Sequence, residues 1–143
     1  MAKPIEILLV EDNLGDVDLT REVLQESTVH HRLHVARDGM EAMAFLRRDG
    51  KYADSPRPNL ILLDLNLPRK DGREVLKEIK ETDSLKRIPV IVLTSSDADA
   101  DINKSYELHA NCYLTKPSGF DELSETLKAV ESFWLKKVKL PPY

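Results

Sequence analysis

The sequence predicts one α/β domain in which a five-stranded parallel sheet is covered by helices on both faces. Short runs rich in Ile, Val and Leu alternate along the chain with longer segments of helical periodicity, which is the order of strand–helix–strand units. Four of the five apolar runs are nearly continuous, as is typical of strands buried on both faces. The length of 143 residues suits a single domain, expected over residues 1–140, with a short tail over 141–143.

Each element has its own signal in the sequence. The strands are expected at the apolar runs 5–10, 33–36, 60–63, 90–93 and 112–114. Apolar residues at helical spacing place the helices over 17–24, 42–46, 75–79 and, more weakly, 102–109, with a final stripe over 123–138. The pairs Asp38-Gly39 and Asp71-Gly72 mark the starts of the second and third helices.

The composition argues against several classes of partner and location. The chain carries 21 Lys and Arg against 25 Asp and Glu, a net charge of −4, whereas nucleic-acid phosphates are held mostly by clustered Lys and Arg. A single cysteine cannot form an internal disulfide. No apolar run approaches the roughly 20 residues that a membrane-spanning helix needs. A cytoplasmic protein with no membrane or direct nucleic-acid partner is therefore expected, and the length leaves no room for an attached output domain.

Polar side chains follow four of the expected strands at the point where each strand ends. They are Glu11 and Asp12, Asp64, Thr94 and Ser95, and Thr115 and Lys116. In open parallel sheets, ligands bind outside the carboxyl ends of the strands. We therefore expect three carboxylates, a hydroxyl and an ammonium to converge on one edge of the sheet.

This set of groups favours a metal ion and phosphoryl chemistry. Carboxylates held close together repel one another unless a cation neutralises them. An incomplete set of oxygen ligands without His or Cys suits Mg²⁺ better than a full Ca²⁺ cage. Lys116 can balance Asp64 at rest and hold a phosphoryl oxygen. Asp64 is then the candidate nucleophile toward phosphorus, forming an aspartyl phosphate.

Five short segments occur in the order and spacing of a known family. They are LLVED at 8–12, LLDLNLP at 62–68, DG at 71–72, TS at 94–95 and TKP at 115–117. Together they resemble a response regulator receiver domain of two-component signalling, over residues 5 to about 138. The resemblance implies the flavodoxin-like doubly wound (βα)5 fold with strand order 2-1-3-4-5. It also implies that Asp64 accepts a phosphoryl group from a phosphohistidine on a sensor histidine kinase.

The resemblance further implies how the site is built. Mg²⁺ would be bound by Asp12, Asp64 and the backbone carbonyl of Asn66, with Glu11 acting through a water molecule. A protein of this family is a phospho-acceptor that assists its own phosphorylation and dephosphorylation, and not an enzyme acting on a free substrate.

A conformational switch is also implied by the resemblance. Lys116 would hold the phosphoryl group, and its bond to Pro117 would be cis, a rare isomer that needs tertiary support. Thr94 would swing to hydrogen-bond the phosphoryl group and so let Tyr113 rotate inward. The face made by the fourth helix, fifth strand and fifth helix would repack for partner binding or dimerisation.

Several further features resemble the stand-alone regulators that are paired with bacterial and cyanobacterial phytochromes. These are the run 11–16, the extended connection before Asn59, the loop 65–68 and the long last helix with its aromatic tail. This narrower resemblance implies a red-light photoreceptor kinase as partner and a homodimer. Phe133 falls off the apolar stripe of the last helix and is a candidate dimer contact, although it could also lie flat on the surface.

Other interpretations compete with the signalling switch. A Mg²⁺-dependent aspartyl-phosphate phosphatase of the haloacid dehalogenase type would carry a second Asp two residues after its nucleophile, where this chain has Asn66, which cannot exchange a proton. A passive flavodoxin-like binding module would need a Gly-rich phosphate loop after the first strand, and none is present there. Asp16 and Asp18 are expected to be solvated residues of a first helical turn.

Overall fold

The five strands form one parallel sheet in the order β2-β1-β3-β4-β5, which confirms the predicted fold class. The computed structural model describes residues 3–142, so Tyr143 of the expected tail lies outside the described residues. The strands are β1 (Ile5–Val10), β2 (His31–Ala36), β3 (Leu60–Leu63), β4 (Val90–Thr94) and β5 (Cys112–Thr115). β2 begins two residues earlier than the apolar run because the polar residues His31 and Arg32 pair with Ile5 and Glu6 of β1.

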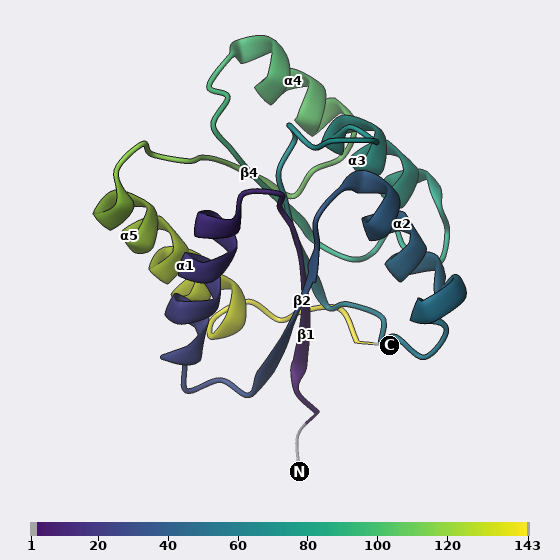
Figure 1. Ribbon diagram of the computed structural model, residues 1–143, viewed down its shortest axis with the longest axis horizontal. Helices are drawn as coiled ribbons and strands as arrows, with labels where there is room; N and C mark the ends of the chain where they lie inside the picture. The colour runs from purple at the N-terminus through teal and green to yellow at the C-terminus, as the bar shows by residue number, and fades with distance from the viewer. Residues whose placement is uncertain (1–2, 143) are drawn as a thin grey trace.

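Helices cover both faces of the sheet. They are α1 (Leu14–Gln25), α2 (Gly39–Arg47), α3 (Gly72–Glu81), α4 (Asp99–Glu107) and α5 (Phe120–Val130), and a short 3-10 turn, η1 (Gly50–Tyr52), follows α2. In Figure 1, α1 and α5 lie on one side of the sheet and α2, α3 and α4 on the other. The side chains of Asp38 and Asp71 cap α2 and α3, as predicted, by accepting from the backbone N–H groups of Glu41 and Arg73.

Two apolar layers explain why the strand sequences read as continuous apolar runs. Along β1, Ile7 and Leu9 pack on the α1–α5 side. Their neighbours Leu8 and Val10 pack on the α2–α3 side. Since successive side chains of a strand point to opposite faces, a strand buried on both faces has no polar alternation. Among residues 3–142, no helix is long and apolar enough to cross a bilayer.

The last helix departs from the prediction of one regular stripe over 123–138. α5 ends at Val130, and the next residues, Glu131–Leu135, form a π-helical turn, η2. A π turn has more residues per turn than an α-helix, so it shifts the faces on which later side chains lie. Phe133 remains 55% exposed, as its position off the stripe indicated, and its ring packs edge-to-face on Trp134. The chain then runs from the α5 side to the side on which α2 lies, as the yellow segment in Figure 1 shows.

Candidate functional site

Backbone hydrogen bonds fix three of the predicted site residues just beyond the strand ends, at the upper edge of the sheet in Figure 1. The N–H of Glu11 donates to the carbonyl of Ala36, 3.0 Å away, and the N–H of Asp64 donates to the carbonyl of Val10, also 3.0 Å away. The N–H of Lys116 donates to the carbonyl of Thr94 at 2.7 Å. The parallel ladder therefore continues one residue past the strands and brings these side chains to one edge.

The Lys116 ammonium is the centre of the site. Its side chain is only 7% exposed. It donates to Oε1 of Glu11, to Oδ2 of Asp16 at 2.9 Å and to Oδ2 of Asp64 at 3.1 Å. The expected resting contact between Lys116 and Asp64 is thus present in the structure.

The expectation for Asp16 is correct in part: the residue lies in the first turn of α1, but its carboxylate pairs with Lys116 and is not fully solvated. Asp18 is exposed, as expected. Asn13 caps α1 by accepting from the N–H of Asp16 at 3.0 Å, and this start sets the helical register so that the Asp16 carboxylate faces Lys116. The sequence holds a signal for this placement, because Asp16 lies one helical turn before Thr20, which is buried. A residue four positions before a buried one shares its face of the helix.

Three carboxylates at this edge can hold a metal ion. Oxygen atoms of Glu11, Asp12 and Asp64 lie within 4.8 Å of one another, with Glu11 and Asp64 buried and Asp12 exposed. This all-oxygen set with an open side fits a hard divalent cation that keeps water ligands. Burial raises the pKa of Glu11 to about 7, with the Asp64 charge adding to the rise and the Lys116 ammonium opposing it. A bound cation would remove the repulsion between these charges.

The raised pKa of Glu11 makes metal binding depend on pH. We expect the apparent affinity for a divalent cation to weaken by up to about tenfold per pH unit below about pH 7, because Glu11 must then lose a proton to face the cation. Above about pH 7 the carboxylate is already ionised, so the affinity levels off. Calorimetric titration at about pH 6 and about pH 8, in buffers of different ionisation enthalpy, measures both the affinity and the protons released. An affinity that is the same at both pH values would contradict the prediction.

The two residues expected to switch lie beside this edge. Thr94 is completely buried, and its hydroxyl has no hydrogen-bond partner within residues 3–142. A buried polar group without a partner costs about 1–3 kcal/mol, so this hydroxyl would gain from a nearby acceptor. Tyr113 is partly buried, and its hydroxyl donates to the backbone carbonyl of Ser96 in the loop between β4 and α4, at 2.8 Å.

The expected cis bond before Pro117 is not found. All peptide bonds in the described part of the chain are trans, including the one between Lys116 and Pro117. Trans is the preferred isomer of an X-Pro bond, and with it the Lys116 ammonium already reaches all of its carboxylate partners.

The site opens to solvent through a cleft between α1 and the loop that precedes α5. This cleft has a volume of about 320 Å³, and its lining includes Asp16, Ser95, Lys116 and Phe120. Two large apolar side chains lie exposed at the start of these helices, Leu14 with 57% and Phe120 with 66% of its surface in solvent. Sequence reasoning did not single out this pair, because exposure depends on how the two helix starts are placed in the fold.

Comparison with known proteins identifies the family. The family model described as response regulator receiver domain matches residues 7–128. The chain belongs to the response regulator receiver domain family. It is 59% identical over 138 residues to response regulator Rcp1 of Synechocystis sp., covering 96% of this chain and 94% of that protein.

Solved structures of similar receivers agree with the fold, and one of them contains a bound divalent metal ion. The Mn²⁺-bound form of response regulator Rcp1 has a TM-score of 0.96 at 58% identity, covering 97% of this chain and 100% of that one. The phosphorylated cyanobacterial phytochrome response regulator RcpA has a TM-score of 0.95 at 54% identity, covering 98% and 100%. This receiver is therefore a response regulator related to phytochrome response regulators.

Proposed function

We propose that this receiver takes a phosphoryl group from a phosphohistidine of a sensor histidine kinase onto Asp64, with Mg²⁺ bound beside it. The observation that carries the proposal is the convergence of one ammonium and three carboxylates that could hold a metal ion at one edge of the sheet. An arrangement of this kind supplies alignment and charge neutralisation, which are what phosphoryl transfer asks of a protein.

The Asp64 side chain is oriented for this chemistry. Its Oδ1 accepts from the N–H of Asn66 at 3.2 Å, and its Oδ2 accepts from Lys116 at 3.1 Å. A carboxylate oxygen forms the new P–O bond while the P–N bond to the histidine breaks. The imidazole keeps the electron pair of that bond and takes up a proton from water.

The residues that would hold the ion and the phosphoryl group are all present. Mg²⁺ would be held by Asp12, Asp64 and the carbonyl of Asn66, with Glu11 acting through water, and it would neutralise charge on the phosphoryl oxygens. Lys116 would donate to the phosphoryl group. The residue two positions after Asp64 is Asn66, whose amide cannot act as a general acid. We therefore do not propose turnover on a free substrate.

The response to phosphorylation would pass through Thr94 and Tyr113. The unpartnered Thr94 hydroxyl would gain a phosphoryl oxygen as acceptor, and Tyr113 would then leave the Ser96 carbonyl. α4 is suited to move, because Ser105 is the only residue that it buries and elements with little buried surface open most easily. The surface formed by α4, β5 and α5 is thus the proposed output face.

A small phosphodonor tests the proposal directly. With Mg²⁺ present, we expect the intact mass of the protein to rise once by about 80 Da, with the added group mapped to Asp64. A phosphatase would instead hydrolyse many equivalents of the donor without accumulating the added mass, and a passive binding module would do neither. Either of those results would overturn the proposal.

The relatives indicate which partners to test first. Because RcpA is a cyanobacterial phytochrome response regulator similar along its whole length, we propose a phytochrome-type sensor kinase as the phosphoryl donor. A homodimer with Phe133 as a contact is consistent with the 55% exposure of that side chain. The cytoplasmic location and the absence of direct nucleic-acid and membrane partners stay predictions.

The exposed aromatic at the mouth of the cleft offers a test of kinase docking. Replacing Phe120 by Asp is expected to slow phosphotransfer from the kinase by at least about tenfold, because large exposed apolar residues near an interface centre carry much of its affinity. Labelling by the small phosphodonor should not change, since Phe120 touches none of the reacting groups. The rates are measured from purified, phosphohistidine-loaded kinase.

The matched control is Phe133→Asp, which changes an exposed phenylalanine of similar accessibility in η2, the turn that follows α5. This variant should receive the phosphoryl group at the wild-type rate. Equal rates of phosphotransfer to the Phe120 variant and to wild type would show that the mouth of the cleft is not part of the kinase-docking surface.

A further inference from the structure

The Asp16–Lys116 ion pair lies next to the proposed metal ligands without belonging to them. Oδ2 of Asp16 is 2.9 Å from the Lys116 ammonium, whereas the carboxylates placed to share an ion are Glu11, Asp12 and Asp64. Asp16 is therefore not one of the carboxylates grouped around the candidate metal position, and its contact with Lys116 needs a separate explanation.

All three N–H donors of the Lys116 ammonium already have carboxylate partners at rest. A lysine ammonium has three N–H groups, and in this structure they are directed at Glu11, Asp16 and Asp64. All of the donors are therefore in use before any phosphoryl group arrives. For Lys116 to bind a phosphoryl oxygen, one of these contacts must be given up.

Burial decides which contact is given up. The side chain of Glu11 is 4% exposed and that of Asp64 is 9% exposed, whereas that of Asp16 is 26% exposed. A carboxylate that loses its cation is least costly to release where water can replace the lost hydrogen bond. Asp16 also lines the cleft of about 320 Å³ that reaches Lys116, so water has access to it.

The position of Asp16 in α1 keeps its carboxylate stable after release. Its own N–H is bound by the Asn13 side chain at 3.0 Å, which places it in the first turn of the helix. A negative charge in the first turn is stabilised by the helix dipole. Release of Lys116 therefore does not leave the Asp16 charge unsupported.

We propose that Asp16 is a positioning residue that holds the Lys116 ammonium at rest and competes with the phosphoryl group for it. This inference rests on the proposed function, since it concerns the same phosphoryl group on Asp64. The Asp16–Lys116 contact exists only in the resting state. Its free energy is lost when Lys116 binds the phosphoryl group, and the phosphoryl group is bound more weakly by that amount. Asp16 thereby limits how firmly the receiver retains its phosphoryl group.

Titration with beryllofluoride, a non-covalent mimic of the phosphoryl group, measures this competition at equilibrium. In saturating Mg²⁺, the full chain carrying Asp16→Asn is expected to bind beryllofluoride about fivefold more tightly than wild type, the effect of one partly exposed ion pair. The phosphorylated variant should also keep its phosphoryl group longer. Asp16→Glu, which restores the charge, should return both values toward those of wild type.

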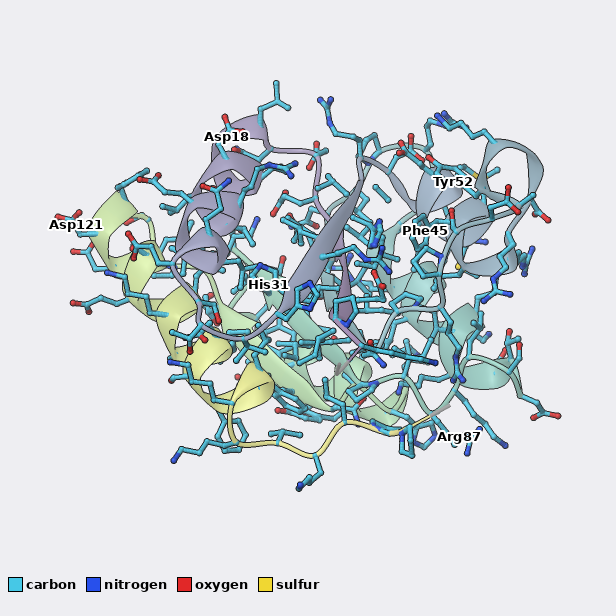
Figure 2. All side chains as sticks on the ribbon, turned by 90° about the horizontal axis from the view of Figure 1, so that it is seen from below. Asp18, His31, Phe45, Tyr52, Arg87 and Asp121 are labelled. Carbon is cyan, nitrogen blue, oxygen red and sulfur yellow. The ribbon has the colours of Figure 1, made fainter. Side chains whose placement is uncertain are left out.

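Asp18→Asn is the matched control, because it removes the same charge from the same helix. Asp18 is exposed, and Figure 2 shows it on the outer surface of α1. This variant should bind beryllofluoride as wild type does, and amide spectra verify that each variant is folded. If the Asp16→Asn and Asp18→Asn variants bound beryllofluoride with equal affinity, the proposal that Asp16 competes for Lys116 would be overturned. If wild type itself takes up neither beryllofluoride nor a phosphoryl group, it is the proposed function that fails.

Discussion

Replacing Asp64 by asparagine is expected to abolish phosphoryl uptake completely and to leave the metal-free protein at least as stable as wild type. The amide oxygen is a far weaker nucleophile than the carboxylate, so no aspartyl phosphate can form. Stability is expected to hold because the Asp64 charge helps to raise the pKa of the buried Glu11 carboxyl. Removing this charge relieves repulsion between buried carboxylates, while Lys116 keeps Glu11 and Asp16 as partners.

Two measurements separate these effects. The intact mass after treatment with the phosphodonor and Mg²⁺ should stay at that of the unmodified variant. In thermal unfolding, added Mg²⁺ should stabilise wild type more than the variant, which has lost one of the carboxylates proposed to hold the ion. Asp121→Asn serves as the control, because it changes an exposed acid that Figure 2 shows at the outer edge of the molecule. A mass gain in the Asp64→Asn variant would show that another residue accepts the phosphoryl group.

The parts of the site that sequence reasoning located are those fixed by the topology of the sheet. A strand buried on both faces is recognisable from its continuous apolar run, and in a parallel sheet the carboxyl ends of the strands share one edge. The positions of the residues just after each run can therefore be predicted without knowing where the helices lie. Glu11, Asp64 and Lys116 meet for this reason, each held by a backbone bond that extends the ladder.

The parts that were missed depend on how separate elements are placed against one another. The contact of Asp16 with Lys116 joins residues 100 positions apart and depends on the rotation of α1 about its axis. Glu6 lies within an apolar run of β1 yet is buried, where its carboxylate accepts from Arg32 and contacts His34 at 2.8 Å on the neighbouring strand. Only the strand register, which pairs Glu6 with Arg32, brings these charges together.

Replacing Gly72 by alanine is expected to destabilise the fold by about 3 kcal/mol or more and to slow phosphorylation as well. A Cβ at this position would lie 2.2 Å from the carbonyl oxygen of Asp64 and 2.6 Å from the Cα of Leu65. Both neighbours are backbone atoms of the segment that carries Asp64, so neither can turn aside as a side chain would. The N–H of Gly72 also donates to the carbonyl of Leu65 at 2.9 Å, which holds α3 against this segment.

The same contact links the Asp71-Gly72 pair to the chemistry of the site. To admit a methyl group, α3 must move away or the backbone at Asp64 must shift, and the second movement would disturb the carboxylate contact with Lys116. Denaturant unfolding and the rate of labelling by the phosphodonor measure the two consequences separately. Gly15→Ala is the control, because its new Cβ would meet only the side-chain oxygen of Asn13, at 3.3 Å, and alanine favours the helix. If Gly72→Ala unfolded at the same denaturant concentration as Gly15→Ala, the close approach of α3 to the backbone of Asp64 and Leu65 would not be what requires glycine at this position.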